Sequence, residues 1–330
     1  MRLIIQIPCL NEESTLPETL AELPQHIEGI DEIKVLIIDD GSTDNTAQVA
    51  RDCGVDYIIS HTSNRGLAVA FQTGLDACLE RGADIIVNTD ADNQYPGRYI
   101  ADLVRPILNQ EADMVIGDRQ THTIPHFSRV KKMLQYFGSA VVRRVSNTDV
   151  VDAPSGFRAL SRNTALRLNI ITTYTYTLET IIQAGKKNLT VVSVPIETNP
   201  KTRESRLIKN IPSYVLRSAT TILRLFVLYE PLKTFFYLSF PFLLVGGGLW
   251  LRYIFLAMSD EVGRGAHVQS VIVGAALLII GFLVFLIGIL GELIAINRHL
   301  HEETLFRLKK SALENYHHQQ KMPDDESLEL

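Results

Sequence analysis

Two long apolar runs near the C-terminus constrain the architecture of this chain more than any other feature of its sequence. Leu232–Ala257 and Gln269–Ile296 each exceed the roughly 20 residues that an α-helix needs to cross a bilayer. A short polar segment, Ser259–Val268, separates them. The sequence therefore predicts a hairpin of two membrane-spanning helices, and places any soluble domain in the residues before it.

The basic residues around this hairpin predict its orientation. Those before and after the pair of spans are Arg224, Lys233, Arg298, Arg307, Lys309 and Lys310. The connecting segment carries a single arginine, Arg264. Because positively charged flanks stay on the cytoplasmic side, we expect the N-terminal domain and the C-terminal tail in the cytoplasm. Glu292 either lies at the membrane interface or pairs with a basic residue such as Arg298.

The segment before the first span carries both apolar and basic residues. Ile211–Tyr229 has Arg217 and Arg224 among Leu, Ile, Val and Phe. Its position favours an amphipathic helix at the membrane surface over an ordinary packed surface helix. We therefore expect a soluble domain at 1–210, an interfacial helix at 211–231, the two-helix hairpin at 232–298 and a cytoplasmic tail at 299–330 with a disordered acidic end.

Strand-like and helix-like segments alternate through the first 200 residues. The strand-like runs are Leu3–Ile7, Lys34–Ile38, Tyr57–Ser60, Ile85–Thr89, Met114–Gly117 and Leu189–Ile196. The helix-like segments are Glu12–Leu23, Asn45–Cys53, Asn64–Glu80 and Tyr176–Ala184. This alternation predicts an α/β fold with a doubly wound, mostly parallel sheet.

Charge and cysteine content exclude some classes of protein. The formal net charge is −5, so nothing indicates a nucleic-acid partner. Cys9, Cys53 and Cys78 form no C-x-x-C pair and leave an odd count, which argues against a disulfide framework and fits a reducing compartment. The apolar run at the N-terminus, Leu3–Ile7, is too short for a signal peptide and is typical of a first strand.

Two carboxylates follow the buried-looking run Ala83–Val87. Asp90 and Asp92 are two residues apart and would lie where a strand ends. Ligands of α/β sheets bind at the carboxyl ends of strands, and carboxylate oxygens suit Mg²⁺ or Mn²⁺ bridging a diphosphate. The alternative for an isolated D-x-D is a solvated turn rich in Asp and Asn.

Other polar clusters end neighbouring strands and favour the metal–nucleotide interpretation. They are Pro8-Cys9-Leu10-Asn11-Glu12-Glu13, Asp39-Asp40-Gly41-Ser42, Asp90-Ala91-Asp92-Asn93-Gln94 and Asp118-Arg119. We expect them to converge on one rim of the sheet. No G-x-G-x-x-G follows the first strand and no P-loop motif occurs, which argues against a Rossmann dehydrogenase and a P-loop NTPase.

These clusters, extended to Thr43 and Asp44, with Gly117-Asp118-Arg119 and Ser155-Gly156-Phe157-Arg158, occur in an order that resembles inverting GT-A-type glycosyltransferases. The pattern is most similar to the polyprenyl-phosphate glycosyltransferase family, which includes dolichyl-phosphate mannose synthases and bactoprenyl-phosphate glucosyltransferases. The resemblance covers about residues 1–210 by motif and the C-terminal spans by architecture. It implies a GT-A fold and a nucleotide-sugar donor.

The resemblance also implies roles for individual residues. The nucleotide sugar would be bound by Pro8, Asn11, Glu12, Asp39, Asp40, Asp90, Ala91 and Arg119. Within this set, Asp40 and Glu12 would bind the base and ribose, whereas Asp39 either joins them or holds its own loop. Mg²⁺ or Mn²⁺ would be bound by Asp90, Asp92 and Gln94 and would neutralise charge on the leaving diphosphate.

Catalytic roles are implied for Asp92, Arg119, Asp152 and Arg158. Arg119 would assist at the sugar or diphosphate, or would form a loop salt bridge. Asp152 would orient Arg158 or the acceptor, or would be structural. A helix residue, Glu179, would face the acceptor side. The segment containing Arg203, Ser205 and Arg206 would meet the lipid phosphate or diphosphate, or anionic membrane lipids.

The reaction implied is attack by a polyprenyl-phosphate oxygen on the anomeric carbon of the donor sugar. A phosphate monoester is largely dianionic at pH 7, since its second pKa is near ~6, and it needs little help from a general base. The alternatives are transfer to another glycolipid or a protein, and a non-catalytic nucleotide-sugar-binding membrane scaffold. The family pattern, with the glycines of the second span, also implies a homo-oligomer.

Overall fold

The computed structural model describes residues 1–120, 129–170, 176–200, 216, 219–220, 223–224, 226–258 and 268–321. The chain divides into two compact units, one formed by 1–219 with 305–330 and the other by 220–304. Of the predicted interfacial helix, 211–229, the structure describes residues 216, 219–220, 223–224 and 226–229, and all of these are helical.

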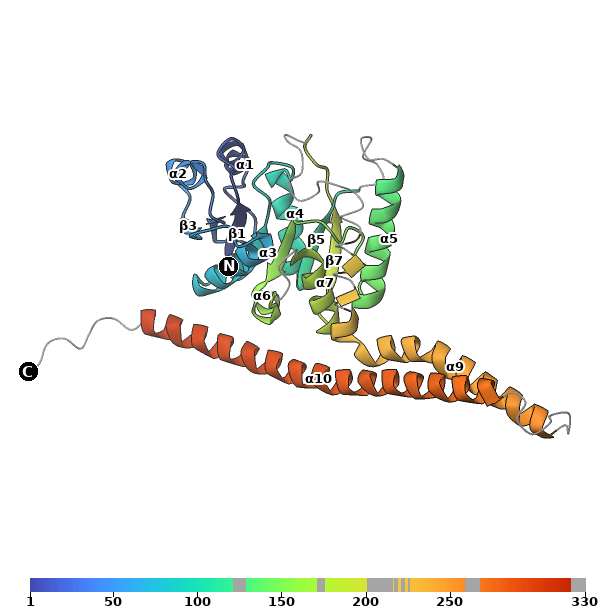
Figure 1. The fold of residues 1–330 in the computed structure, drawn as a ribbon. Helices are drawn as coiled ribbons and strands as arrows, with labels where there is room; N and C mark the ends of the chain where they lie inside the picture. The colour runs from blue at the N-terminus through green and yellow to red at the C-terminus, as the bar shows by residue number, and fades with distance from the viewer. Residues whose placement is uncertain are drawn as a thin grey trace, which may run out of the picture. The chain divides into compact units, whose positions relative to one another are not determined.

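The first unit is built on a seven-stranded sheet with the order β3-β2-β1-β4-β6-β5-β7 (Figure 1). The strands are β1 (Arg2–Cys9), β2 (Glu32–Asp39), β3 (Tyr57–Ser60), β4 (Ile85–Asn88), β5 (Met114–Asp118), β6 (Arg158–Ser161) and β7 (Val191–Pro195). All pair in parallel except β6, which is antiparallel to both β4 and β5. The predicted α/β, mostly parallel sheet is confirmed, and β6 is the strand that the sequence did not predict.

Helices connect the strands as the alternating pattern predicts. They are α1 (Leu16–Ala21), α2 (Thr46–Asp52), α3 (Leu67–Glu80), the 3₁₀ turn η1 (Gly97–Tyr99), α4 (Ile100–Leu108), α5 (Arg129–Ser146), α6 (Arg162–Arg167) and α7 (Tyr176–Lys186). The first helix is shorter than the predicted Glu12–Leu23. Asn11 takes a left-handed φ of 55°, and the helix begins only at Leu16, with Pro17 in its first turn.

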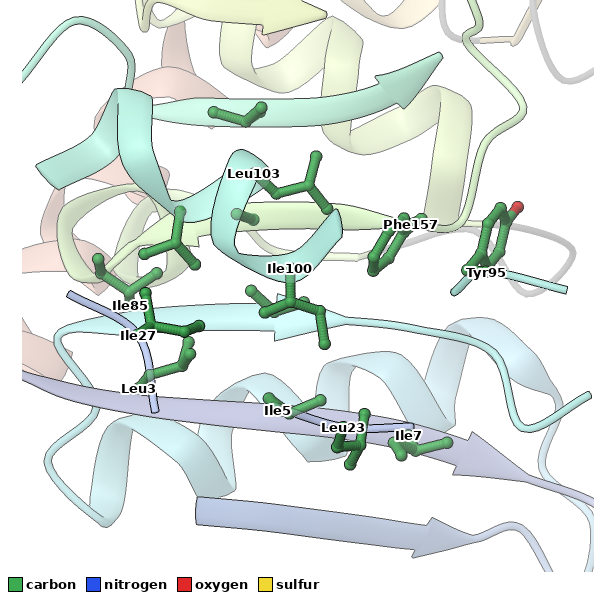
Figure 2. Close-up of a cluster of buried hydrophobic side chains, with 14 of the residues drawn as sticks. Leu3, Ile5, Ile7, Leu23, Ile27, Ile85, Tyr95, Ile100, Leu103 and Phe157 are labelled. Carbon is green, nitrogen blue, oxygen red and sulfur yellow. The ribbon is translucent and has the colours of Figure 1, made fainter. Parts of the chain in front are cut away.

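Alternation along the strands separates two apolar layers. Leu3, Ile5 and Ile7 of β1 belong to one core cluster with Ile100 and Leu103 of α4, as Figure 2 shows. The other face of β1 meets α3, and it is not wholly apolar. Gln6 lies so close to Gly74 of α3 that a Cβ there would be 2.5 Å from the amide oxygen. The buried layers fix the strand register and therefore the positions of the strand ends.

The antiparallel direction of β6 shapes the rim of the sheet. Arg158, at the start of β6, pairs with Asn88 at the end of β4 and with Ile116 near the end of β5. The residues just before β6 therefore lie at the same edge as the carboxyl ends of β1, β2, β4 and β5. This places the Ser155-Gly156-Phe157 segment beside the acidic residues that follow β4.

The second unit contains two helices that are long and apolar enough to cross a membrane, α9 (Pro231–Met258) and the first part of α10 (Val268–Lys321). They lie side by side (Figure 1). Their backbones approach closely at glycines. A Cβ on Gly246 would lie 2.9 Å from the Gly274 carbonyl oxygen, and one on Gly288 would lie 2.8 Å from the Phe235 Cβ. The helix α10 continues through 299–321, so the predicted tail is helical as far as it is described.

Gly97 offers a test of how the loop after β4 is supported. A Cβ at this position would lie 2.1 Å from the Glu22 carbonyl oxygen, which follows α1. We expect Gly97→Ala to lower the free energy of unfolding by about 1–3 kcal/mol, because backbone atoms must move apart. Gly138→Ala in α5, where nothing lies within 4 Å of the added Cβ, is the matched control and should be neutral or slightly stabilising. Thermal unfolding in detergent measures both, and equal melting temperatures would contradict the expectation.

Candidate active site

The acidic loop begins where β4 ends and is fixed by side chains of its own. The Asp92 carboxylate accepts hydrogen bonds from the Gln94 backbone N–H (3.2 Å) and from its side-chain Nε2 (2.9 Å). The Ala91 carbonyl accepts from the Thr19 hydroxyl at 3.0 Å. Asn199 bonds the loop twice, through its backbone N–H to the Gln94 carbonyl and its Nδ2 to the Asn93 carbonyl. The loop is therefore held from α1 and from the segment that follows β7.

Asp90 lies directly against the backbone of Gly156. A Cβ at position 156 would be 3.1 Å from both Asp90 carboxylate oxygens and from the Tyr176 hydroxyl. The Gly156 N–H donates to the Tyr95 hydroxyl (3.3 Å), and its carbonyl accepts from Asn88 Nδ2 (2.9 Å). A side chain at 156 would crowd the carboxylate, so the glycine lets the two strand ends approach.

Burial and charge make Asp90 an unusual acid. Burial raises its pKa to about 7, the nearby Asp92 charge adds to this, and Arg119 and Arg158 oppose it. A divalent cation at the two carboxylates would relieve the same repulsion. In the described part of the chain, no three His, Cys, Asp or Glu side chains gather as a metal site. The pair therefore fits an ion such as Mg²⁺ that keeps water or phosphate oxygens as its other ligands.

Arg119 and Asp152 form a two-pronged ion pair beside the acidic loop. Arg119 Nε lies 2.7 Å and Nη2 2.9 Å from the Asp152 oxygens, and the Arg119 backbone N–H also donates to Asp152 at 3.2 Å. Asp152 is 2% exposed, whereas Arg119 is partly exposed. This geometry fixes the guanidinium plane at the end of β5. Asp152 thus pairs with Arg119, and no hydrogen bond joins it to Arg158 among the contacts described.

Arg158 is fully buried. Its guanidinium donates to the Thr177 carbonyl at 3.2 Å and also to the Thr180 hydroxyl and the Ser155 carbonyl. The Arg158 Cζ lies 5.2 Å from the centre of the Tyr176 ring. These contacts tie α7 to the start of β6. The burial and these contacts are what a positioning residue would show, and the catalytic role of Arg158 stays a prediction.

Polar residues at the ends of β1 and β2 bond to one another. The Asn11 side-chain oxygen accepts from the Thr43 N–H at 2.7 Å, and the Asn11 N–H donates to the Ser42 hydroxyl at 2.9 Å. Asp39 accepts from the Ser42 N–H at 3.0 Å. Pro8 lies within β1 beside these residues. The predicted nucleotide-binding residues of both strand ends are therefore brought together at one edge.

Glu12 and Asp40 are both buried at this edge, with 5% and 4% of their surface exposed. Glu12 accepts a hydrogen bond from the Thr15 hydroxyl at 2.9 Å. Asp40 accepts from the backbone N–H groups of Arg65 (2.9 Å) and Gly66 (2.8 Å) and contacts His61 Nδ1 at 2.6 Å. The loop-holding role that we expected as an alternative for Asp39 is thus also filled by Asp40.

Several residues of this region were not singled out from the sequence. Asn88, Tyr95 and Tyr176 surround Gly156, and Tyr95 stacks on Phe157 with ring centres 5.0 Å apart (Figure 2). None belongs to a motif with a mechanism of its own, so only the fold reveals them. Burial raises the pKa of Tyr95 to about 12, which keeps its hydroxyl neutral.

Two expectations about the acceptor side stay predictions, one at Glu179 and one at the basic segment after β7. Glu179 is buried on α7, where it accepts a hydrogen bond from Gln183 at 3.2 Å. Arg203, Ser205 and Arg206 lie outside the described residues.

Comparisons with known proteins agree with this geometry. The model of the glycosyl transferase family 2 matches residues 4–167. An undecaprenyl-phosphate mannosyltransferase of Micrococcus luteus is 30% identical over 207 residues, which are 59% of this chain and 83% of the relative. A UDP-N-acetylglucosamine–dolichyl-phosphate N-acetylglucosaminyltransferase of Methanococcus voltae is 28% identical over 223 residues, which are 58% and 83%.

A solved structure shows the same fold. The glucosyl-3-phosphoglycerate synthase of Mycobacterium tuberculosis, in complex with Mn²⁺, UDP and its product, has a TM-score of 0.53 and 20% identity. The match covers 67% of this chain and 79% of that one.

The chain belongs to glycosyl transferase family 2 and is a glycosyltransferase with a GT-A fold. Its resemblance to the polyprenyl-phosphate glycosyltransferases is confirmed, since the named relatives above are members of that group.

The raised pKa of Asp90 predicts a pH-dependent cost in stability. Between about pH 4 and pH 7 the folded state holds a proton that the unfolded state has lost, so the free energy of unfolding falls as pH rises through this range. We expect Asp90→Asn to stabilise the metal-free protein more at about pH 8 than at about pH 5, by on the order of 2 kcal/mol. Thermal unfolding of Asp90→Asn and wild type at both pH values measures this difference in stability. Asp102→Asn on α4 is the control. If the free energy of unfolding of Asp90→Asn differs from that of wild type by the same amount at both pH values, this explanation is contradicted.

Proposed function

We propose that this glycosyltransferase is anchored in the membrane and transfers one hexose, most simply glucose or mannose, from a UDP- or GDP-sugar to a polyprenyl phosphate at the cytoplasmic leaflet. Two named relatives support the acceptor, since one is an undecaprenyl-phosphate and the other a dolichyl-phosphate transferase. Their sugars differ, so they leave the choice of hexose to experiment.

One observation carries the donor part of the proposal. Asp90 and Asp92 lie together on the bend after β4, and Asp90 is half-buried against the Gly156 backbone with a pKa raised to about 7. A protein keeps such a costly pair of acids where their charge is used. The structural relative was solved with Mn²⁺ and UDP, which supports a metal–diphosphate site of this kind.

The residues at the rim have complementary tasks in this proposal. Asp90 and Asp92, with Gln94 beside them, hold Mg²⁺ or Mn²⁺. When bound, the metal neutralises negative charge on the leaving diphosphate. Two hydrogen bonds to Asp152 fix the guanidinium plane of Arg119. In this proposal Arg119 adds a fixed positive charge at the sugar or diphosphate. The cluster of Pro8, Asn11, Glu12, Asp39 and Asp40 forms the part of the rim where the nucleoside end of the donor binds.

The acceptor needs positioning more than activation. An oxygen of the lipid phosphate forms a bond to the anomeric carbon while the bond from that carbon to the nucleoside diphosphate breaks, which inverts the configuration. Because the phosphate is already largely dianionic at pH 7, no side chain has to remove a proton. Catalysis then depends on aligning two anions and stabilising the leaving group.

The hairpin supports a membrane acceptor. The helices α9 and α10 are long and apolar enough to span a bilayer. Basic residues flank them on the N- and C-terminal sides, which favours a cytoplasmic catalytic domain. In this proposal Arg203, Ser205 and Arg206 meet the lipid phosphate just before the membrane. The glycines of α10 pack against α9 of the same chain, so the proposed homo-oligomer rests on the family resemblance.

Release of the nucleoside diphosphate tests the proposal. Purified protein in detergent, with Mn²⁺ and undecaprenyl phosphate, is offered a panel of UDP- and GDP-sugars. We expect release from one donor, dependent on the lipid, and a loss of at least about 100-fold in Asp92→Ala. Asp102→Asn serves as the control for a distant carboxylate. Release that is equal without lipid would overturn the acceptor, and full activity of Asp92→Ala would overturn the metal site.

A further inference from the structure

The loop between β3 and α3 is held to the rim of the sheet by a buried chain of polar side chains. His61 Nδ1 lies 2.6 Å from Asp40 Oδ1, and His61 Nε2 lies 3.1 Å from the Thr73 hydroxyl on α3. The side chains of His61 and Asp40 are only 6% and 5% exposed. Because a carboxylate only accepts, Nδ1 carries the proton and donates it to Asp40.

The same carboxylate also orders the loop backbone. Asp40 Oδ1 accepts from the Arg65 N–H at 2.9 Å, and Oδ2 accepts from the Gly66 N–H at 2.8 Å. Three protein donors therefore converge on one buried acid. A carboxylate offers about four acceptor positions, so most of the capacity of Asp40 is spent within the protein.

A close backbone contact fixes the loop from its other side. Gly41, directly after Asp40, has a φ of +71°. A Cβ at this glycine would lie 2.5 Å from the Ser63 carbonyl carbon and 2.6 Å from the Asn64 nitrogen. The loop 61–66 thus rests on the backbone of residues 40–41, and a shift in Asp40 must move the loop.

This loop lies at the same edge as the acidic pair. The strand β2, which ends beside Asp40, is separated from β4 by β1 alone. Two strand spacings amount to about 10 Å. A nucleotide whose diphosphate lies at Asp92 can therefore extend its nucleoside across the end of β1 toward residues 61–66.

We infer that His61 is a positioning residue for the nucleoside diphosphate, acting through Asp40 to hold loop 61–66 as the wall against which the nucleoside binds. This inference rests on the proposed function. It differs from a direct contact between Asp40 and the base, because it assigns Asp40 to the loop and the ligand contact to the loop itself. Thr73 sets the orientation of the imidazole from the far side.

Binding of nucleoside diphosphates to the full chain in detergent tests this inference. Wild type is titrated calorimetrically with UDP and with GDP in the presence of Mn²⁺, and the tighter ligand is then used for His61→Ala. We expect its dissociation constant to rise about tenfold, as loss of one charge-assisted hydrogen bond predicts. The KM for the donor should rise by a similar factor, whereas the KM for polyprenyl phosphate and kcat should stay within about threefold.

Two further variants keep the test decisive. Thr73→Val removes only the hydrogen bond between the Thr73 hydroxyl and His61 Nε2. We expect a smaller rise of about threefold in the same dissociation constant. His26→Ala changes an exposed histidine and should bind like wild type. If His61→Ala does not fold, Thr73→Val decides the question, and wild-type binding by that variant would overturn the inference.

Hydrogen exchange gives a readout that does not depend on turnover. In wild type, UDP or GDP should slow exchange in the peptide that contains Arg65 and Gly66, and His61→Ala should speed it. Nucleotide binding without added protection of this loop would overturn the inference while leaving the proposed function intact. Failure of wild type to bind either nucleotide would instead overturn the proposed function, and this inference with it.

Discussion

The close approach of Asp90 to the backbone of Gly156 is the contact on which the site depends. It brings the end of β4 against the start of β6, two segments far apart in the sequence, and it works only because β6 runs antiparallel to its neighbours. A carboxylate held in this way is partly desolvated and close to a second one. The fold thus carries an electrostatic cost at the position where a diphosphate and its metal would cancel it.

The surrounding residues limit that cost without removing it. Arg158 supplies a buried positive charge whose hydrogen bonds all go to neighbouring protein groups, and Arg119 supplies a second one from the end of β5. In the ion pair between Arg119 and Asp152, the two opposite charges at the end of β5 offset each other. The pair also keeps the guanidinium fixed. Buried polar groups at Asn88 and Tyr176 complete the support of Gly156. The described side chains of the site are therefore held by contacts within the protein, and a reaction that depends on alignment benefits from such positioning.

Much of this arrangement was predictable because it follows from periodic patterns. The apolar strands, the acids at their ends and the two long apolar helices follow from local periodicity and composition. The strand β6 was missed because Arg158–Ser161 is short, begins with a charged residue and lies next to Ser155-Gly156, which is more typical of a loop. The sequence did not predict the helical extension of α10 beyond Ile296, because apolar residues become less frequent after the span. A helix rich in charged residues has a composition similar to that of a polar tail.

The roles of individual acids could not be read from spacing alone. Asp39 and Asp40 are adjacent and chemically identical, and only their hydrogen bonds distinguish them. Asp40 accepts hydrogen bonds from His61, Arg65 and Gly66, whereas Asp39 accepts one from Ser42. Likewise, the pairing of Asp152 with Arg119 rather than Arg158 depends on where two loops meet in space. Such contacts join residues far apart in the chain, and no local pattern encodes them.

The location of a bound metal would show whether Asp90 and Asp92 form the diphosphate site. The full chain in detergent, saturated with Mn²⁺ and the nucleoside diphosphate that binds more tightly, can be crystallised and the manganese located by anomalous scattering. We predict a single strong peak within about 2.3 Å of an Asp92 oxygen, beside Asp90, and in contact with the diphosphate. A bound nucleotide with no manganese at these two carboxylates, or with manganese at another site, would contradict it.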